Sequence, residues 1–390
     1  MLLFDIEGFH TSTTTFTPIR LHFAINNNNI DSVQKLIDQG LDLNFYAFGN
    51  TPLMLSLLRE SLDIAYALIV AGASIEIGEK FKWQRKPIHL AARIGDLKLV
   101  KEMVSRCPKC VHSVDAMLFT PLHWAAMKGL LEVVHYLVES GAHLNVRDDQ
   151  GRTPLHRAAD SDRLDMVCLL IKEGALVNLQ DNFGWTPLYQ SIVCAQLDMV
   201  NQLLDFGANV FVRDIYGMTP LHVACGRKVP RNLKVMQKTS TDFYTRGFRS
   251  ATDAVQKAVS ICESDLPLVE ILLDFGADVN AIGGDGRMPL RIAADAGNKE
   301  IIRLLVSACA NLSLESWISV GEWPKKIADD GEFCAWLREV SSSRIFSLMQ
   351  LCKAVIRRAV TRNNAGRKIH EKVVKLPLPS ALKQFLFVSL

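Results

Sequence analysis

The sequence predicts an all-α fold: an array of helix pairs with short hairpin loops, followed by a small module of three helices. Two observations lead to this prediction. A turn-plus-helix motif repeats along the body of the chain, and its prolines fall 33 residues apart from Pro121 to Pro220. Apolar residues then recur at three- and four-residue spacing, as on one face of an α-helix. A fixed period of this length is typical of repeat architectures.

Length and composition agree with an array. A chain of 390 residues is too long for one compact core. Its content of 22% charged and 49% hydrophobic residues excludes a disordered or fibrous protein. No run of about 18 uncharged apolar residues is present, and acidic residues interrupt the apolar stretch that begins at Met1. We therefore expect a soluble cytoplasmic protein, with the nucleus as an alternative, and no membrane partner.

Each unit of the array opens with a proline, usually after a threonine. The threonine caps the first helix, and proline in the first turn loses no hydrogen bond, because that N–H has no partner inside the helix. Gly-Ala pairs such as Gly174-Ala175 end the second helix, where glycine permits a left-handed turn. The motif recurs at Thr17-Pro18, Thr51-Pro52, Lys86-Pro87, Thr120-Pro121, Thr153-Pro154, Thr186-Pro187, Thr219-Pro220 and Met288-Pro289.

This pattern resembles the ankyrin-repeat family from about residue 17 to 340. The resemblance implies about eight repeats and a partial cap over 17–340, after an N-terminal extension at 1–16. From Pro220 to Pro289 the spacing is 69 residues, one 33-residue period and a further 36. We therefore predict an insertion at about 226–262 that splits one repeat. This basic segment is either a tolerated surface loop or a part of the binding surface.

Histidine follows the Thr-Pro motif in several units. Histidines in number are candidates for a metal or catalytic site, but one histidine in the same slot of each unit favours a structural hydrogen-bonding role. Tyr189 and Arg291 fill this slot in other units, which agrees with that role. The histidines concerned are His89, His123, His156 and His222.

The cysteines also argue against a metal centre. Nine cysteines without a regular spacing indicate free thiols in a chain large enough to fold without disulfides. The close pair Cys107 and Cys110 lacks a second pair that would complete a zinc site. We expect no metal and no cofactor.

The segment 344–390 differs from the repeats in charge and in pattern. It holds ten Lys and Arg residues against one acidic residue, Glu371, a net charge of +9. From Arg344 to Val360 the apolar residues recur at helical spacing, with basic residues on the opposite face. Such a helix is expected to dock onto a partner, and its charge favours association with an acidic one.

The motifs of this segment resemble a SOCS box. Ser347, Leu348, Cys352 and Ile356 are similar to its elongin C-binding helix, and Leu376-Pro377-Leu378-Pro379 is similar to its cullin-5-selecting segment. Ankyrin repeats followed by a SOCS box is the arrangement of the ankyrin repeat and SOCS box family. The resemblance implies that Ser347, Leu348, Cys352, Val355 and Ile356 bind elongin C and that Leu376, Pro377, Leu378 and Pro379 bind the cullin.

This family resemblance implies a function. The chain would be the substrate-recognition subunit of an elongin B/C–cullin-5 RING E3 ubiquitin ligase, whose repeats bind a target protein that the sequence does not identify. The alternative is a non-catalytic ankyrin scaffold or adaptor without ligase recruitment. We expect no enzyme, because phosphate-binding, serine-hydrolase and zinc-protease motifs are missing. We expect no nucleic-acid partner, because the basic tail lacks interleaved stacking aromatics.

Target-binding candidates come from two positions in the repeat. The residue after the repeat histidine is expected on the exposed side of the first helix, and hairpin tips are expected at the surface. Trp, Tyr and Arg dominate interface energies, although several of these side chains are equally compatible with packing between hairpins. The candidates are Trp124, Arg157, Phe183, Trp185, Arg213 and Tyr216.

One modification site follows from resemblance. Leu272 and Asp278-Val279-Asn280 resemble the sequence in which an oxygenase hydroxylates ankyrin asparagines. Asn280 is therefore a candidate for hydroxylation. The alternative is a structural asparagine that closes the hairpin.

Overall fold

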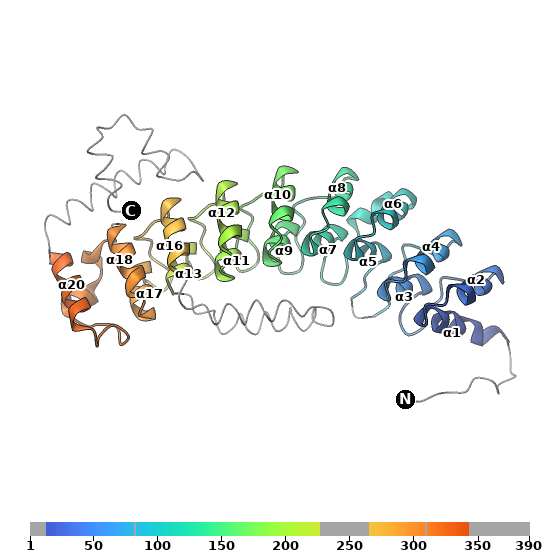
Figure 1. Cartoon of the computed structure of the whole chain (residues 1–390), viewed down its shortest axis with the longest axis horizontal. Helices are drawn as coiled ribbons and strands as arrows, with labels where there is room; N and C mark the ends of the chain where they lie inside the picture. The colour runs from blue at the N-terminus through green and yellow to red at the C-terminus, as the bar shows by residue number, and fades with distance from the viewer. Residues whose placement is uncertain (1–12, 82, 227–264, 309, 343–390) are drawn as a thin grey trace. The chain divides into compact units, whose positions relative to one another are not determined.

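The structure is a computed structural model that describes residues 13–81, 83–226, 265–308 and 310–342 (Figure 1). Within these ranges the regular elements are helices, and an isolated β-bridge joins Ala47 and Asn50. The predicted all-α array of helix pairs is confirmed there. The chain forms two compact units, Met1–Ala175 and Leu176–Leu390. The predicted SOCS box lies outside the described residues.

The first unit is a series of helix pairs whose first helices pack on one another in chain order. The residue after the opening proline of α3, α5, α7 and α9 is apolar and contributes to this core. These side chains are fully buried: Leu53, Ile88, Leu122 and Leu155. Helix α1 begins before the expected boundary at residue 17. The pairs are α1 (Thr13–Asn26) and α2 (Ile30–Asp38), α3 (Pro52–Leu58) and α4 (Leu62–Val70), α5 (Pro87–Ile94) and α6 (Leu97–Arg106), α7 (Pro121–Lys128) and α8 (Leu131–Glu139), and α9 (Pro154–Asp160) and α10 (Leu164–Lys172), with the 3-10 helix η1 (Pro108–His112) after α6.

The second unit continues the pattern on both sides of the predicted insertion. Helices α13 and α16, which flank it in sequence, pack together as a pair, and α17 packs on α13. The insertion itself falls almost entirely in 227–264, outside the described residues. The pairs are α11 (Pro187–Val193) and α12 (Leu197–Asp205), α13 (Pro220–Gly226) and α16 (Asp265–Asp274), α17 (Pro289–Ala296) and α18 (Lys299–Ser307), and α19 (Ser316–Val320) and α20 (Gly331–Ser342), with η2 (Leu312–Leu314) before α19.

The Thr-Pro motif starts the first helices as predicted. Thr120 and Thr153 each accept a hydrogen bond from the backbone N–H three residues ahead, and a proline opens the helix that follows. Thr51 and Thr186 do the same. At the other end of α7, Gly129 adopts φ 78°, a left-handed conformation that glycine reaches without strain.

The repeat histidines join each first helix to the next hairpin. His123 is fully buried; its Nδ1 accepts the N–H of Thr120 at 3.2 Å, and its Nε2 donates to the carbonyl of Arg152 at 3.2 Å. His89 does the same with Lys86 and Ser113. Burial lowers the pKa of both His89 and His123 to about 4, so the rings are neutral at pH 7. Their predicted structural role is confirmed.

Candidate target-binding surface

An aspartate recurs at the same position of several hairpins between repeats. This position is called the aspartate slot. Asp148 is buried, and its Oδ1 accepts the N–H groups of Gln150 and Arg152, both at 2.9 Å. The same pair of bonds recurs at the three other repeats in which this position is an aspartate. The sequence analysis does not identify this recurring buried position, although the 33-residue spacing of the aspartates is a sufficient signal. The slot is occupied by Asp115, Asp148, Asp181 and Asp214.

In the first unit, the second oxygen of this carboxylate holds the residue that follows the repeat histidine. Trp124 Nε1 donates to Asp115 Oδ2 at 3.1 Å. Arg157 donates to Asp148 Oδ2 from Nε at 2.8 Å and from Nη2 at 2.5 Å. The Arg157 guanidinium also lies 4.7 Å from the centre of the Phe119 ring.

These contacts bury two of the predicted target-binding residues. Trp124 is 6% exposed and Arg157 is 2% exposed. The expectation that the residue after the repeat histidine faces solvent is therefore wrong for both of them. The physical reason is the carboxylate in the preceding hairpin, which draws both polar side chains inward and satisfies them there.

In the second unit, Phe183 and Trp185 belong to an aromatic cluster. Trp185 is 8% exposed and stacks on Tyr189, with the ring centres 5.3 Å apart. Phe183 is half-buried and packs against the same cluster beside Val223. The predicted exposure is therefore wrong for Trp185, whereas Phe183 keeps a partly accessible edge.

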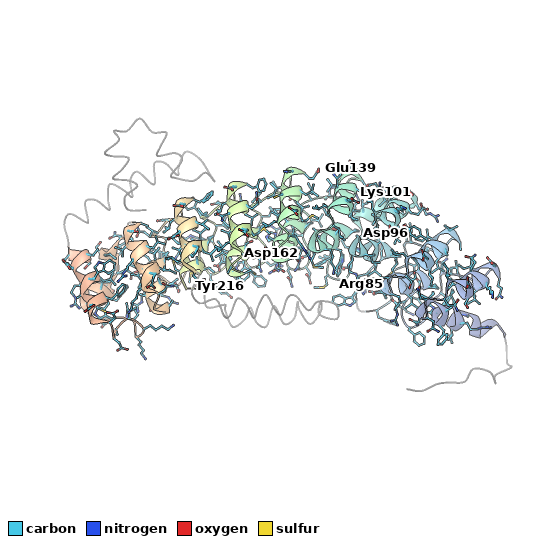
Figure 2. All side chains as sticks on the ribbon, viewed as in Figure 1. Arg85, Asp96, Lys101, Glu139, Asp162 and Tyr216 are labelled. Carbon is cyan, nitrogen blue, oxygen red and sulfur yellow. The ribbon has the colours of Figure 1, made fainter. Side chains whose placement is uncertain are left out.

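Arg213 and Tyr216 lie in the next hairpin and behave differently. Arg213 Nη1 donates to the carbonyls of Gly217 and Ile282, both at 2.6 Å, and so ties two successive hairpins together. Tyr216 is 64% exposed, and Figure 2 shows it at the lower edge of the ribbon. Of the six predicted residues, Arg213 and Tyr216 are the exposed ones, and Arg213 is tied to the hairpin carbonyls by its hydrogen bonds.

Asn280 lies at a junction between repeats. Its Oδ1 accepts the N–H of Asn311 at 2.7 Å, and its own N–H donates to Asp278 Oδ1 at 3.0 Å. Asn44 and Asn178 accept the N–H groups of Ser74 and Asn209 in the same way, each at 2.7 Å. This geometry agrees with a structural asparagine. Hydroxylation of Asn280 stays a prediction.

The described residues show no metal centre. No group of three or more His, Cys, Asp or Glu side chains among them is placed to bind an ion. The Cys107 thiol donates to Glu76 Oε1 at 3.1 Å, and burial raises the pKa of the Cys110 thiol to about 12. Both are therefore thiols, not thiolates, at pH 7.

Across the same ranges, every helix falls short of the length and apolar character needed to cross a bilayer.

Comparisons with known families cover both parts of the chain. Models described as ankyrin repeats match residues 53–148, 88–181 and 155–242, and a further one matches 255–306. A model of the SOCS box matches residues 344–386. The chain is a member of the ankyrin repeat and SOCS box family. The predicted elongin C-binding and cullin-binding residues of this family member lie outside the described residues.

Several known proteins are similar to part of the chain. The chain is 33% identical over 134 residues to a protein of Saccharomyces cerevisiae named "Probable 26S proteasome regulatory subunit p28", covering 33% of this chain and 58% of the relative. It is 35% identical over 138 residues to NF-kappa-B inhibitor alpha of Mus musculus, covering 33% and 43%. It is 28% identical over 170 residues to inversin of Danio rerio, covering 35% and 16%. The chain thus spans less than two thirds of each relative.

A solved structure is similar over part of the chain. The ankyrin repeat domain of Bcl-3 is 28% identical and covers 55% of this chain and 97% of its own, with a TM-score of 0.46.

Ankyrin repeats with a SOCS box support, in general terms, the role of a cullin-RING substrate receptor. This combination of domains suggests an adaptor protein.

Proposed function

We propose that this member of the ankyrin repeat and SOCS box family is the substrate-recognition subunit of an elongin B/C–cullin-5 RING E3 ubiquitin ligase in the cytoplasm. The observation that carries the proposal is the order of the domains. The SOCS box match at 344–386 follows directly on the repeats, whose helix α20 (Gly331–Ser342) ends at Ser342. A target bound to the repeats is thereby linked to the ligase through the adjoining box.

The residues of the box have distinct roles in this proposal. Leu348 is the main apolar anchor for elongin C, and Cys352 and Ile356 follow one and two helical turns later on the same stripe. Cys352 serves as a small apolar side chain and not as a nucleophile. Ser347 and Val355 complete the elongin C surface, and Leu376 to Pro379 contact the cullin. Their two prolines restrict the segment and so lower the entropy lost on binding.

The repeats supply a rigid platform for the target. Successive hairpins share backbone hydrogen bonds: Ile215 N–H donates to the Phe183 carbonyl and Gly284 N–H to the Tyr216 carbonyl, at 3.0 and 3.1 Å. An exposed side chain on such a framework loses little freedom on binding. In the second unit we propose Tyr216, with the open edge of Phe183, as target contacts. Trp124, Arg157 and Trp185 are buried and support the hairpins instead, and the exposed Arg213 ties two hairpins together through its hydrogen bonds.

The decisive experiment is co-expression of the full chain with elongins B and C, followed by size exclusion and titration with the cullin-5 N-terminal domain. We expect a stable complex with the wild type, none with Leu348→Ser, and an unchanged complex with the control Gln350→Ser, which lies off the apolar stripe. Circular dichroism should show the same helix content in all three. A soluble, folded wild-type chain that does not bind elongin would contradict the proposal and leave a scaffold.

A further inference from the structure

Four exposed side chains lie on two neighbouring hairpins of the first unit. We name this set the aromatic patch: Tyr46 and Phe48 before α3, and Lys80 and Phe81 before α5. Tyr46 and Phe81 stand at the position that the aspartate slot has in the later hairpins. The exposed fraction is 44% for Tyr46, 88% for Phe48 and 63% for Phe81. Large apolar side chains that group at a surface are typical of an interaction site.

Contacts between the two hairpins hold the patch together. The Lys80 N–H donates to the Gly49 carbonyl at 3.0 Å, and the Phe81 ring covers Gly49 so closely that an added Cβ would lie 2.8 Å from its Cδ2. The Tyr46 hydroxyl donates to the Gly78 carbonyl at 3.2 Å. The Lys80 ammonium lies 5.8 Å from the centre of the Tyr46 ring and 5.7 Å from that of Phe81, within cation–π range. Side chains fixed in this way lose little freedom when a partner binds.

The fold gives no reason for a phenylalanine at position 48. Phe48 and Gly49 form a two-residue turn, with φ 53° and 82°. The flanking Ala47 and Asn50 close it with two backbone hydrogen bonds, at 3.0 and 3.1 Å. A turn with both φ angles positive favours Asn, Asp or Gly at its first position and disfavours a bulky ring there. In the hairpin before α9 the equivalent position, three residues before the capping threonine, is Gln150, so the repeat requires no aromatic ring and binding explains Phe48 better.

The charge of Lys80 is available to a partner. The adjacent carboxylate, Glu79, is taken by Arg85, which donates to it from Nη2 at 2.6 Å and from Nε at 3.1 Å. Figure 2 labels Arg85 at the lower edge of the ribbon. No carboxylate in the described ranges stands within ion-pair distance of Lys80. Because opposite charges attract more strongly beside a protein surface than in open water, the patch favours a partner that combines apolar side chains with a carboxylate.

We propose that the aromatic patch binds an extended segment of the target protein in which an apolar side chain and a carboxylate stand two residues apart. Such residues point to the same face of an extended chain and are about 6.6 Å apart. This separation is close to the 5.7 Å between the Lys80 ammonium and the centre of the Phe81 ring, so one segment can reach both. The carboxylate pairs with Lys80, and the apolar side chain packs on Phe81 or Phe48. The proposal rests on the proposed function only for the identity of this segment as part of a ubiquitination target.

The test measures fluorescence anisotropy of a labelled peptide of three Phe-Ser-Asp-Ser blocks with the full chain. All Phe and Asp side chains of this peptide share one face when it is extended. We expect it to bind, and two matched peptides to bind at least about fivefold more weakly, because each lacks one of the two recognised groups. The Phe-Ser-Asn-Ser peptide lacks the charge, and the Ala-Ser-Asp-Ser peptide lacks the rings.

Two variants locate the peptide on the patch. Phe48→Asn places a residue that favours the left-handed conformation in the turn, so it should fold with unchanged or higher stability and yet bind about fivefold more weakly. Lys80→Gln should weaken binding about threefold, because an exposed ion pair is lost. The controls are Phe211→Asn in the second unit and Lys98→Gln on α6, equal changes at exposed positions, which should leave binding unchanged.

Two results would place the peptide elsewhere and overturn the proposal. Equal binding of the three peptides would show that neither group is recognised. Unchanged binding by Phe48→Asn or by Lys80→Gln, or equal losses in their controls, would move the site away from the patch, for instance to the basic segment 344–390. Elongin binding is measured separately with Leu348→Ser, so a chain that binds the peptide but not elongin contradicts only the proposed function.

Two other occupants of the patch are distinguished by further measurements, and either would overturn the proposal. Sedimentation that shows self-association of the chain, lost in Phe48→Asn, would make a second copy the occupant. The segment 1–12 is itself apolar and acidic in sequence. Peptide binding that appears only after this segment is removed would make the chain's own N-terminal segment the occupant.

Discussion

Asp148 in the first unit and Asp214 in the second occupy the same aspartate slot, but their second carboxylate oxygens are satisfied from opposite directions along the chain. In the first unit the partner of the second carboxylate oxygen follows in sequence, as Arg157 does for Asp148. For Asp214 in the second unit the partner precedes: Tyr189, which stands in the histidine slot of the preceding repeat, donates its hydroxyl to Asp214 Oδ2 at 2.6 Å. The accepting aspartate therefore occupies the same position in both hairpins, whereas the donor comes from a residue either after or before it in the chain.

The difference also changes the chemistry. Asp148 and Arg157 form an ion pair whose side chains are 0% and 2% exposed, whereas Tyr189 and Asp214 share a hydrogen bond to a neutral hydroxyl. A buried charge that loses its partner costs more than a lost neutral donor, because the remaining charge has no water around it. The Asp148 site should therefore be more sensitive to loss of its partner than the Asp214 site.

The largest effect is expected for Arg157→Ala. This change leaves the Asp148 carboxylate buried without its cation, and we expect a loss of about 3–5 kcal/mol in the free energy of unfolding. Hydrogen exchange of the α7 and α9 amides measures it within the first unit.

The double variant Arg157→Ala, Asp148→Asn provides the control for Arg157→Ala. It removes the stranded charge and should recover a part of the lost stability. A loss below about 1 kcal/mol in the single variant would mean that water reaches Asp148, and the contrast between the units would fail.

The second effect concerns acid pH. Burial holds the pKa of His89 and His123 at about 4 in the folded chain, against 6.5 for an exposed histidine. The unfolded chain therefore binds more protons between these values, and stability that is present above pH 6.5 is lost as the pH falls toward 4. Each histidine contributes about 1.4 kcal/mol per pH unit in this window.

Amide exchange of the first unit at pH 7 and pH 5.5 checks the effect of acid. His123→Gln, which cannot gain the proton, should lower the pH dependence by the share of one histidine. The exchange rates need correction for the intrinsic effect of pH, for which an unfolded peptide serves as the reference. A first unit whose corrected stability is equal at both pH values would refute the neutral buried state of these histidines.

The histidines and the residues bound to the hairpin aspartates show which features can be predicted from a sequence. Helix pairs and buried histidines follow from the period, because the period places one residue type at one position of every unit. The burial of Trp124 and Arg157 could not be found in this way. It depends on an aspartate nine residues earlier, in the hairpin, and helical periodicity does not report a contact between a loop and a helix. For Tyr189 the partner is 25 residues further on, across a complete helix pair.

Tyr189→Phe tests the contrast from the side of the second unit. It removes the donor to Asp214 Oδ2 and keeps the ring stacked on Trp185, so we expect a loss of about 1–2 kcal/mol, smaller than for Arg157→Ala. Urea unfolding followed by tryptophan fluorescence measures this loss. Tyr216→Phe, which removes an exposed hydroxyl, should change stability by less than about 0.5 kcal/mol. Equal losses in the two variants would show that the hydroxyl of Tyr189 has no special role.

The smallest effect is expected at the asparagines that make the same hydrogen bond in both units. Asn44 in the first unit and Asn280 in the second each accept a backbone N–H of the following repeat at 2.7 Å. Asn44→Ala and Asn280→Ala should each cost about 0.5–1.5 kcal/mol, the net value of one such bond. Hydrogen exchange at the amides of Ser74 and Asn311 measures both losses at the donors themselves. Comparable losses would establish the asparagine as a part of the common framework, in contrast to the aspartate slot. A loss confined to Asn280 would instead mark this junction as specific to the second unit.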